Sequence, residues 1–356
     1  LMKSSPPPSV KTPQSLFVRR LWTLVLAGVG AAVLWVLNVP LPFLFGPLLA
    51  CLVAALLGAP LKGPGQVSVA ARTILGVAVG ASVTPALIGQ LPSMALSVAL
   101  VPVYVIVIGA IGVPFFRRVY KFDMVTSYYA AMPGGLQDMI AFGQEAGADV
   151  RSLSLIHATR VLIIVTIAPI VLTQMFDVQL TQPIGAPIRD VPVHELLIMA
   201  AAALVGWKGG EKIGLFGASI LGPMIVTAVL SLADVIHFRP PAEAILVAQY
   251  FIGIGIGVFY VGVTLRELVR DVAAGTVFVF VLAVLATIFT EIVVVLGLAP
   301  GVEGFLSFAP GGQAEMTVLA IVAGADLGFV IVHHLVRIMV VITGAPIVAG
   351  LLKLRK

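Results

Sequence analysis

Residues 133–172 and 310–349 are two copies of one block, and this duplication limits the folds open to the chain. The copies align at a constant offset of 177 residues without a gap, and 15 of their 40 positions are identical. Each copy of an internal repeat is one structural unit, and the units pack together around a common core. We therefore expect a molecule with two halves of the same design.

The identical positions are mostly polar residues, glycine and proline, although 60% of the chain is hydrophobic. Each block begins with Pro-Gly-Gly, has an acid three residues after the second glycine, and later has histidine and arginine three residues apart. The corresponding residues are Pro133, Gly134, Gly135, Asp138, His157 and Arg160 in the first block and Pro310, Gly311, Gly312, Glu315, His334 and Arg337 in the second. The repeated block is therefore the best candidate for the functional site.

The rest of the chain has the composition of a membrane protein. Only 10% of its 356 residues are charged, whereas soluble proteins carry about 25%. It contains many apolar runs of about 18–25 residues, each long enough to cross roughly 30 Å of hydrocarbon. These runs do not alternate polar and apolar residues as the strands of a membrane β-barrel do. We predict an all-α polytopic membrane protein in a lipid bilayer.

Breaks in the apolar pattern divide the chain into four parts. Residues 1–15 are rich in proline and serine and predict a disordered cytoplasmic tail. Residues 16–176 form the first membrane repeat, residues 177–190 a polar linker, and residues 191–356 the second membrane repeat. The apolar runs predict membrane spans at 17–37, 41–58, 67–90, 92–114, 151–175, 191–207, 213–234, 242–264, 272–298 and 328–352.

In each repeat Pro-Gly-Gly separates two short apolar pieces, 122–131 from 136–146 and 302–309 from 313–324. Proline obstructs a helix in the preceding turn, and glycine lets another group approach the backbone closely. Irregular backbone survives at membrane depth only inside the protein or beside a wet cavity. The free carbonyls of one helix end suit a cation and the free amides of the next suit an anion, as in transporter sites. The alternative is a plain turn between two helices.

The basic residues indicate how these short pieces lie in the membrane. Of the 21 Lys and Arg residues, 18 remain outside the spans when Arg72, Arg160 and Arg337 are left out. If each broken element folds back as a re-entrant hairpin, 16 of the 18 lie on one side, and only Arg189 and Arg239 lie on the other. If it crosses the membrane, the split is 13 to 5. Because positive residues collect on the cytoplasmic side, re-entrant hairpins are favoured.

Re-entrant hairpins leave five transmembrane helices in each repeat, and an odd number places the second repeat upside down relative to the first. We therefore predict two inverted-topology repeats, each with about five transmembrane helices and one re-entrant hairpin at its Pro-Gly-Gly. Both termini are expected in the cytoplasm. The net charge of +5 reflects this topology, so we expect no nucleic-acid partner.

Four ionisable residues of the repeated block are predicted at membrane depth, namely Asp138, Arg160, Glu315 and Arg337. A charge there costs about 2.5–3.5 kcal/mol even on a lenient scale, so it normally faces the protein interior with a partner. Each arginine should meet a carboxylate, a carbonyl of the hairpin tip or an anion of the ligand. Two structural salt bridges, of Asp138 with one arginine and Glu315 with the other, are the alternative.

Four neighbouring polar residues have less certain roles. His157 and His334 lie three residues before the arginines, on a similar face of their helices. They are open to a role as a proton relay or as hydrogen-bonded packing residues. Gln137 and Gln313 lie near the tips, where either could hydrogen-bond a substrate.

Other polar residues have structural interpretations. Asp149 and Asp326 precede the long spans and are predicted to be helix N-caps. Arg72 corresponds to Gln249 in the other half, and we expect its side chain to snorkel to the membrane interface. The five histidines have no metal-ligand spacing, and the single cysteine excludes a cysteine cluster. We therefore predict no metal and no cofactor.

The duplicated module resembles the AbrB family of bacterial membrane proteins, which is often labelled ammonia monooxygenase or AbrB-type regulator. The resemblance covers nearly the whole chain after the tail, and it rests on the two Pro-Gly-Gly motifs with Gly147, Ala148 and Asp149 in one repeat and Gly324, Ala325 and Asp326 in the other. It implies a duplicated protein of the bacterial inner membrane, in a family named after one member's link to gene regulation. Nothing in the chain resembles the soluble DNA-binding domain that is also called AbrB.

These observations favour a secondary transporter. We expect a small anionic, carboxylate-type solute to bind at the tips of the two broken helices, with coupling to H⁺ or Na⁺. An acid or a histidine would carry the proton, or the tip carbonyls would bind sodium. The alternatives are a non-transporting membrane regulator or sensor with a transporter-like core and, least favoured, a membrane enzyme, because clustered metal ligands are missing. The 36 glycines are consistent with close helix packing and a homodimer.

Overall fold

The computed structural model describes residues 15–39, 41–180, 184–215 and 217–354, and it leaves the side chains of Gln137 and Ala141 undescribed. The predicted tail therefore lies outside the described residues except for Ser15, whose hydroxyl accepts a hydrogen bond from Val18 N and caps the first helix. The role expected for the Gln137 side chain also falls outside this description.

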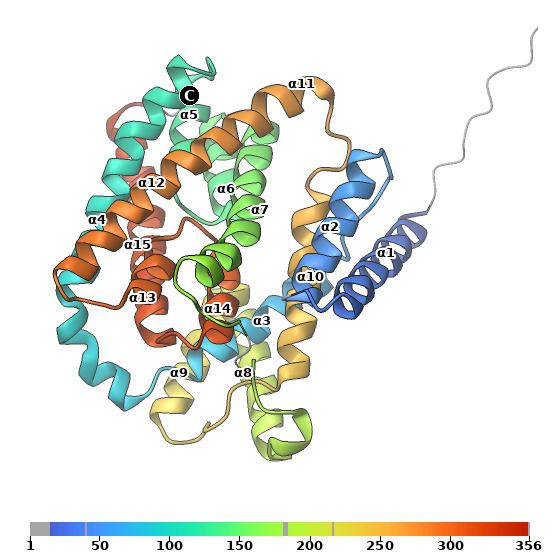
Figure 1. The fold of residues 1–356 in the computed structure, drawn as a ribbon, viewed down its shortest axis with the longest axis vertical. Helices are drawn as coiled ribbons and strands as arrows, with labels where there is room; N and C mark the ends of the chain where they lie inside the picture. The colour runs from blue at the N-terminus through green and yellow to red at the C-terminus, as the bar shows by residue number, and fades with distance from the viewer. Residues whose placement is uncertain (1–14, 40, 181–183, 216, 355–356) are drawn as a thin grey trace, which may run out of the picture.

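All regular secondary structure in the described residues is helical, and the helices correspond between the two repeats (Figure 1). The first repeat contains α1 (Leu16–Val36), α2 (Pro42–Leu56), α3 (Gln66–Gly80), α4 (Pro85–Arg118), α5 (Met124–Ala131), α6 (Leu136–Ala146) and α7 (Val150–Gln174). A short 3₁₀ turn, η1 (Ile188–Asp190), lies in the linker. The second repeat contains α8 (Val193–Lys212), α9 (Ala218–Leu232), α10 (Ala242–Val258), α11 (Leu265–Glu267) with the π-helical turn η2 (Leu268–Val272), α12 (Ala273–Val295), α13 (Gly301–Phe308), α14 (Gln313–Ala323) and α15 (Leu327–Leu351).

Five of the described helices are long and apolar enough to cross a membrane, which indicates a multi-pass membrane protein. They are α1, α4, α7, the continuous helix from α11 to α12, and α15. The spans expected at 41–58, 67–90, 213–234 and 242–264 are helices of only 15 to 17 residues. At 1.5 Å per residue these helices are about 22–26 Å long, shorter than a typical hydrocarbon core.

One predicted helix boundary is wrong. The break expected between residues 90 and 92 lies instead between Gly80, where α3 ends, and Pro85, where α4 begins. The Thr84 hydroxyl accepts a hydrogen bond from Leu87 N at 3.3 Å and caps α4, and proline is favoured at the first helical position. Pro92 lies inside α4, and proline is tolerated in a membrane helix where neighbouring groups re-satisfy the backbone that it frees.

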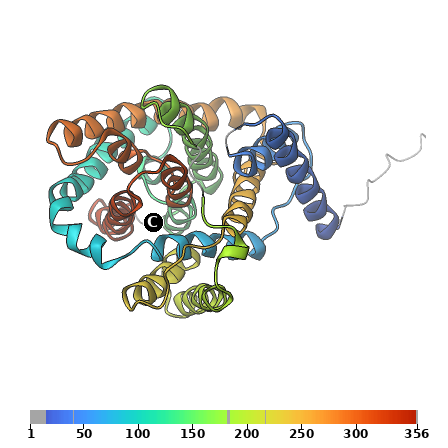
Figure 2. The ribbon, with the colours of Figure 1, turned by 60° about the horizontal axis from the view of Figure 1, so that its bottom comes forward.

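The helices form two bundles, and each bundle takes helices from both repeats (Figures 1 and 2). The panel bundle contains α1, α2 and α3 with α8, α9 and α10, at the right and lower part of Figure 1. The tip bundle contains α4 to α7 with α11 to α15, at the left. The contacts between the repeats are symmetric. The contact of α2 with α10 is matched by that of their counterparts, α9 with α3, and the contact of α4 with α15 is matched by that of α12 with α7.

Glycine allows the closest helix contacts of the panel bundle. A Cβ atom added to Gly76 of α3 would lie 2.4 Å from the carbonyl oxygen of Ile220 in α9. At the equivalent place in the other repeat, a Cβ added to Gly253 of α10 would lie 2.3 Å from the carbonyl oxygen of Leu44 in α2. Small residues let membrane helices approach until their backbones touch. The same glycine-to-backbone contact therefore joins the two repeats at two equivalent places.

Two buried tyrosines join the repeats within the tip bundle. The hydroxyl of Tyr104, in α4, donates to the carbonyl of Phe308 in α13 at 2.7 Å. The hydroxyl of Tyr128, in α5, donates to the carbonyl of Ala345 in α15 at 2.9 Å. Buried tyrosine hydroxyls normally find such a partner. Each hydrogen bond therefore links a short helix of one repeat to a long helix of the other.

Gly76→Ala should destabilise the protein, because the new methyl group would overlap the backbone of α9 and overpacking costs about 1–3 kcal/mol. The matched control is Gly344→Ala in α15, where an added Cβ meets no atom within 4 Å. That control should be neutral or stabilising by up to about 1 kcal/mol, since alanine is the better helix former. Thermal unfolding of both variants in mild detergent, followed by circular dichroism, tests this, and equal melting temperatures would contradict the packing contact.

Candidate functional site

Each repeat contains a pair of short helices separated by four residues. α5 and α6 have 8 and 11 residues, and α13 and α14 have the same lengths. Residues 132–135 and 309–312, which contain the two Pro-Gly-Gly motifs, are called tip 1 and tip 2. The equal lengths confirm that both copies of the repeated block adopt the same local structure.

The second glycine of each motif is required for space and not for a left-handed backbone. The φ angle is −62° at Gly135 and −75° at Gly312, values that any residue adopts. A Cβ atom added at either position would lie 2.1 Å from a carboxylate oxygen of Asp138 or Glu315. Both carboxylates therefore fold back over the first turn of α6 or α14, where free amide groups and the helix dipole stabilise negative charge.

Arg337 holds tip 2 to the middle of α15. Its side chain is 3% exposed, its Nη1 donates to the carbonyl of Ala309 at 2.8 Å, and its Nη2 donates to the carbonyl of Gly311 at 2.7 Å. The planar guanidinium thus satisfies two carbonyls that the end of α13 leaves without a helical partner.

Arg160 makes the equivalent contacts in the first repeat. Its side chain is 4% exposed, and it reaches from α7 to tip 1, where Nη1 donates to Met132 O at 3.2 Å and Nη2 donates to Gly134 O. A tip carbonyl is one of the three partners expected for these arginines. The Nε atom of each arginine has no hydrogen-bond partner in the described residues.

The two histidines hold the same short helices one turn further away. His157 Nε2 lies 3.1 Å from Tyr129 O, and His334 Nε2 lies 2.8 Å from Leu306 O. A carbonyl only accepts, so Nε2 must carry the hydrogen in both rings. His334 Nδ1 then accepts from Arg337 Nη2 at 2.8 Å. The His334 imidazole is therefore neutral, whereas His157 Nδ1 has no hydrogen-bond partner among the described residues. The contacts of both rings with backbone carbonyls favour the packing role over the proton relay.

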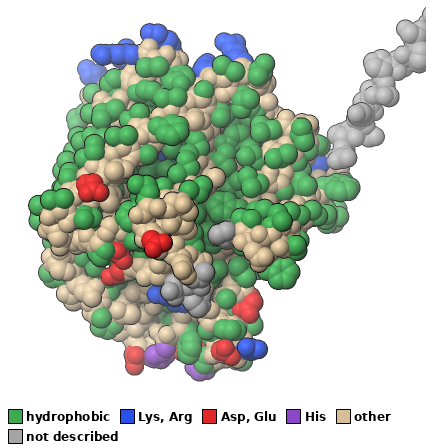
Figure 3. Space-filling model, viewed as in Figure 1, with side chains coloured by type: hydrophobic (Ala, Val, Ile, Leu, Met, Phe, Trp, Pro, Cys, Tyr) green, Lys and Arg blue, Asp and Glu red, His purple; other side chains and the backbone are tan. Residues whose placement is uncertain are grey.

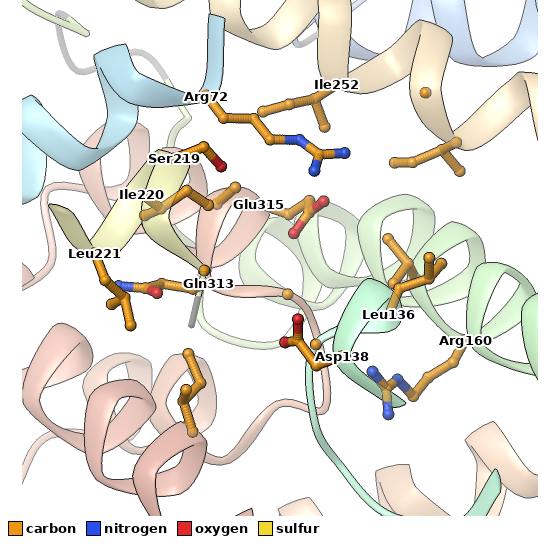
Figure 4. Close-up of a pocket in the computed structure, with 18 of the residues that line it drawn as sticks. Arg72, Leu136, Asp138, Arg160, Ser219, Ile220, Leu221, Ile252, Gln313 and Glu315 are labelled. Carbon is orange, nitrogen blue, oxygen red and sulfur yellow. The ribbon is translucent and has the colours of Figure 1, made fainter. Parts of the chain in front are cut away.

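The structural salt bridges considered as an alternative do not form. Within the described part of the chain, no ion pair joins Asp138 or Glu315 to Arg160 or Arg337. The arginines bind backbone carbonyls, so the two carboxylates remain free to face a cavity (Figure 4).

That cavity has a volume of about 160 Å³ and lies where the two bundles meet. Tip 1 and tip 2 both reach it, although they are far apart in the sequence. The panel bundle supplies α3 and the facing parts of α9 and α10. The polar side chains that line it are Arg72, Asp138, Arg160, Ser219, Gln313 and Glu315. Most of the remaining wall is aliphatic or aromatic, as in many small-molecule sites.

Arg72 is the residue that sequence analysis placed wrongly. It does not snorkel to an interface, because its guanidinium enters the cavity from the middle of α3 (Figure 4). No described residue forms a hydrogen bond or ion pair with it, and the opposite charges that act on it are Glu315 and then Asp138. The available signal was its position, because a charge in the middle of a short apolar helix marks a functional site by default.

The remaining predicted residues are divided between the cavity wall and its support. Gln313 lines the cavity and is 9% exposed, and its Nε2 has no partner among the described residues. Pro133 and Pro310 are buried within the tips, and Arg337 lies behind tip 2, outside the cavity wall.

Asp149 and Asp326 are confirmed as N-caps of α7 and α15, where their carboxylates accept backbone amide hydrogens. The described residues contain no group of three His, Cys, Asp or Glu side chains placed to hold a metal.

The fold and the cavity together define a polytopic helical membrane protein with a duplicated sequence and a cavity between two bundles. A model of the family described as "Transition state regulatory protein AbrB" matches residues 43–353. The chain therefore belongs to the AbrB family.

Two relatives show the same extent of similarity. The protein YhjN of Bacillus subtilis (strain 168), described as uncharacterized, is 26% identical over 354 residues, which cover 92% of each chain. The protein named "Putative regulator AbrB" of Escherichia coli (strain K12) is 24% identical over 323 residues, which cover 88% of this chain and 90% of the relative. Both matches extend through nearly the whole of this chain, so the similarity includes both repeats.

Arg337→Gln should destabilise the protein by about 2–4 kcal/mol, because two charge-assisted hydrogen bonds to buried carbonyls are lost. Arg337→Lys should recover only part of this loss, since an ammonium group lacks the guanidinium fork. Arg118→Gln, at the exposed end of α4, is the control for loss of one positive charge. Unfolding in detergent gives the three stabilities, and equal values for Arg337→Gln and Arg118→Gln would refute the contact with tip 2.

Proposed function

We propose that this protein is a secondary transporter of a small carboxylate-bearing solute and not an enzyme. One observation carries the proposal: two broken-helix tips, one from each repeat, meet an unpaired arginine in one cavity between two bundles. Arg72 would bind the carboxylate through its planar fork, and the free amides at the start of α6 and α14 would add to the attraction.

We propose further that the repeats are inverted and that their short helices are re-entrant hairpins. In support, the α5–α6 pair lies toward the upper end of Figure 1 and the α13–α14 pair lies below it. Lys and Arg side chains gather at the upper end in Figure 3, where the C-terminus also lies in Figure 1. By the positive-inside rule this end would be cytoplasmic, with both termini on that side of a bacterial inner membrane.

Movement between the bundles would open the site to alternate sides of the membrane. The bundles meet chiefly along two helix pairs, α3 with α14 and α7 with α10, whereas many more helix pairs join within each bundle. Because the cavity is lined from both bundles, a shift of one against the other would change access to it. Such rocking around a fixed central site is the common mechanism of repeat-built transporters.

Asp138 and Glu315 are better placed than the tip carbonyls to bind a coupling ion. The carbonyls already accept hydrogen bonds from Arg160 and Arg337. A guanidinium charge beside them would repel a sodium ion. The two carboxylates face the cavity without a salt bridge, so either could take up a proton or contribute an oxygen to a Na⁺ site.

A non-transporting regulator is the second candidate, favoured by the description of the family and by the name of the E. coli relative. Such a protein would bind a solute in the same cavity without moving it across the membrane. Solute flux therefore separates the two functions, whereas binding alone does not.

Purified protein in proteoliposomes should accumulate one or more radiolabelled solutes from a panel of monocarboxylates, dicarboxylates and amino acids. Imposed pH and Na⁺ gradients, applied separately, identify the coupling ion. Arg72→Gln should reduce uptake at least tenfold, because loss of a charge-assisted contact costs about 1.5–3 kcal/mol. Arg160→Gln and Arg337→Gln should also abolish uptake.

Glu145→Gln is the control, because this exposed acid lies on α6 but outside the cavity wall. It should transport normally. Absence of flux for every solute, from protein that is folded by its melting curve, would refute transport. Undiminished uptake by the folded Arg72→Gln variant would refute the proposed site.

A further inference from the structure

The cavity contains charges of both signs that the protein itself leaves unpaired. Arg72 enters from the panel bundle, while Asp138 and Glu315 lie in the first turns of α6 and α14 of the opposite bundle, next to tip 1 and tip 2 (Figure 4). No salt bridge within 4.0 Å involves any of these three side chains in the described residues. They nevertheless act on one another across the cavity, since Glu315 and Asp138 are the carboxylates that influence Arg72.

A simple anion would leave this arrangement unbalanced. Its negative group could bind Arg72, but Asp138 and Glu315 would then face a third negative charge in a site with mostly apolar walls. Arg160 also lines the cavity, but its guanidinium already donates to the carbonyls of tip 1. Charges removed from water need a partner of opposite sign and hydrogen bonds. A solute with one negative and one positive group would satisfy the arginine and a carboxylate at the same time.

On the basis of the proposed transport function, we propose that the solute is a small zwitterion of the α-amino acid type. Its carboxylate binds Arg72 in a bidentate manner. Its ammonium group lies against Glu315 and Asp138, with each carboxylate held in place over the first turn of its helix.

The size and walls of the cavity agree with such a solute. Its volume of about 160 Å³ corresponds to about five water molecules at roughly 30 Å³ each. Arg72 and Glu315 face each other across this small space, so the two charges of the solute must be close together, as they are on one α-carbon. The side chain of the solute would contact Ile252 and Ile256 of α10 and Phe259, which follows the helix as its C-cap.

The first experiment measures binding to the full-length wild-type protein in detergent by calorimetry. The probes are the standard L-α-amino acids, each compared with its 2-hydroxy acid, which lacks the ammonium group, and with its decarboxylated amine. At least one amino acid should bind about tenfold or more tightly than both of its analogues, because each analogue lacks one charge-assisted contact. Equal binding of the amino acid and the 2-hydroxy acid would overturn the zwitterion, and so would binding by neither class.

Substitutions in the cavity test the binding of the carboxylate and of the ammonium group of the solute separately. Arg72→Gln should weaken both the best amino acid and its 2-hydroxy acid at least tenfold. Glu315→Gln and Asp138→Asn should weaken the amino acid but not the 2-hydroxy acid, so the preference between them shrinks. Glu145→Gln, on the exposed face of α6, should preserve the wild-type preference. An unchanged preference in folded Glu315→Gln and Asp138→Asn would overturn the assignment of the ammonium group.

Failure of the zwitterion proposal can be distinguished from failure of the proposed transport function. Tight binding of an amino acid without flux would refute transport and leave the zwitterion site intact. Flux of 2-hydroxy acids or other simple carboxylates in preference to amino acids would support transport and overturn the zwitterion.

Discussion

The rest of this structure depends on the contact between a buried guanidinium and the carbonyls of a broken helix. Backbone that leaves a helix within a membrane exposes polar groups that lipid cannot satisfy, and a buried arginine is equally costly without a partner. Here each cost offsets the other, because Arg160 and Arg337 donate to the tip carbonyls of their own repeats. The neighbouring histidines bind carbonyls one turn earlier, so each short helix is held at two places.

With the tips held in this way, the two acids become available for another purpose. Arg160 and Arg337 have no ion pair with Asp138 or Glu315 in the described residues, so the carboxylates point into the space between the bundles. The site is therefore assembled from a rigid, symmetric support and a less symmetric wall. The first turn of α9 lines the cavity, whereas the first turn of the equivalent helix α2 does not. Arg72 lines it as well, whereas its counterpart Gln249 is fully buried elsewhere.

Sequence reasoning was accurate where the local signal was strong. Pro-Gly-Gly predicted both breaks, and Asp149 and Asp326 predicted the starts of α7 and α15. It failed at the start of α4, where the break was expected between residues 90 and 92 and the helix begins instead at Pro85, after the cap at Thr84. It placed Arg72 near an interface because the span was expected at 67–90, whereas α3 ends at Gly80 and has Arg72 near its middle. The inversion of the repeats is still a prediction.

The sequence by itself determined that the chain is helical, membrane-embedded and duplicated, and it identified the repeated polar residues as the centre of interest. These properties depend on composition and periodicity, which are local. Only the tertiary structure decided which partners the arginines choose, since a carboxylate, a carbonyl and a ligand are all acceptable to a guanidinium. It also decided that Arg72 faces both tips. Those outcomes depend on how α3 of one bundle lies against α14 of the other, and packing between distant segments has no local pattern.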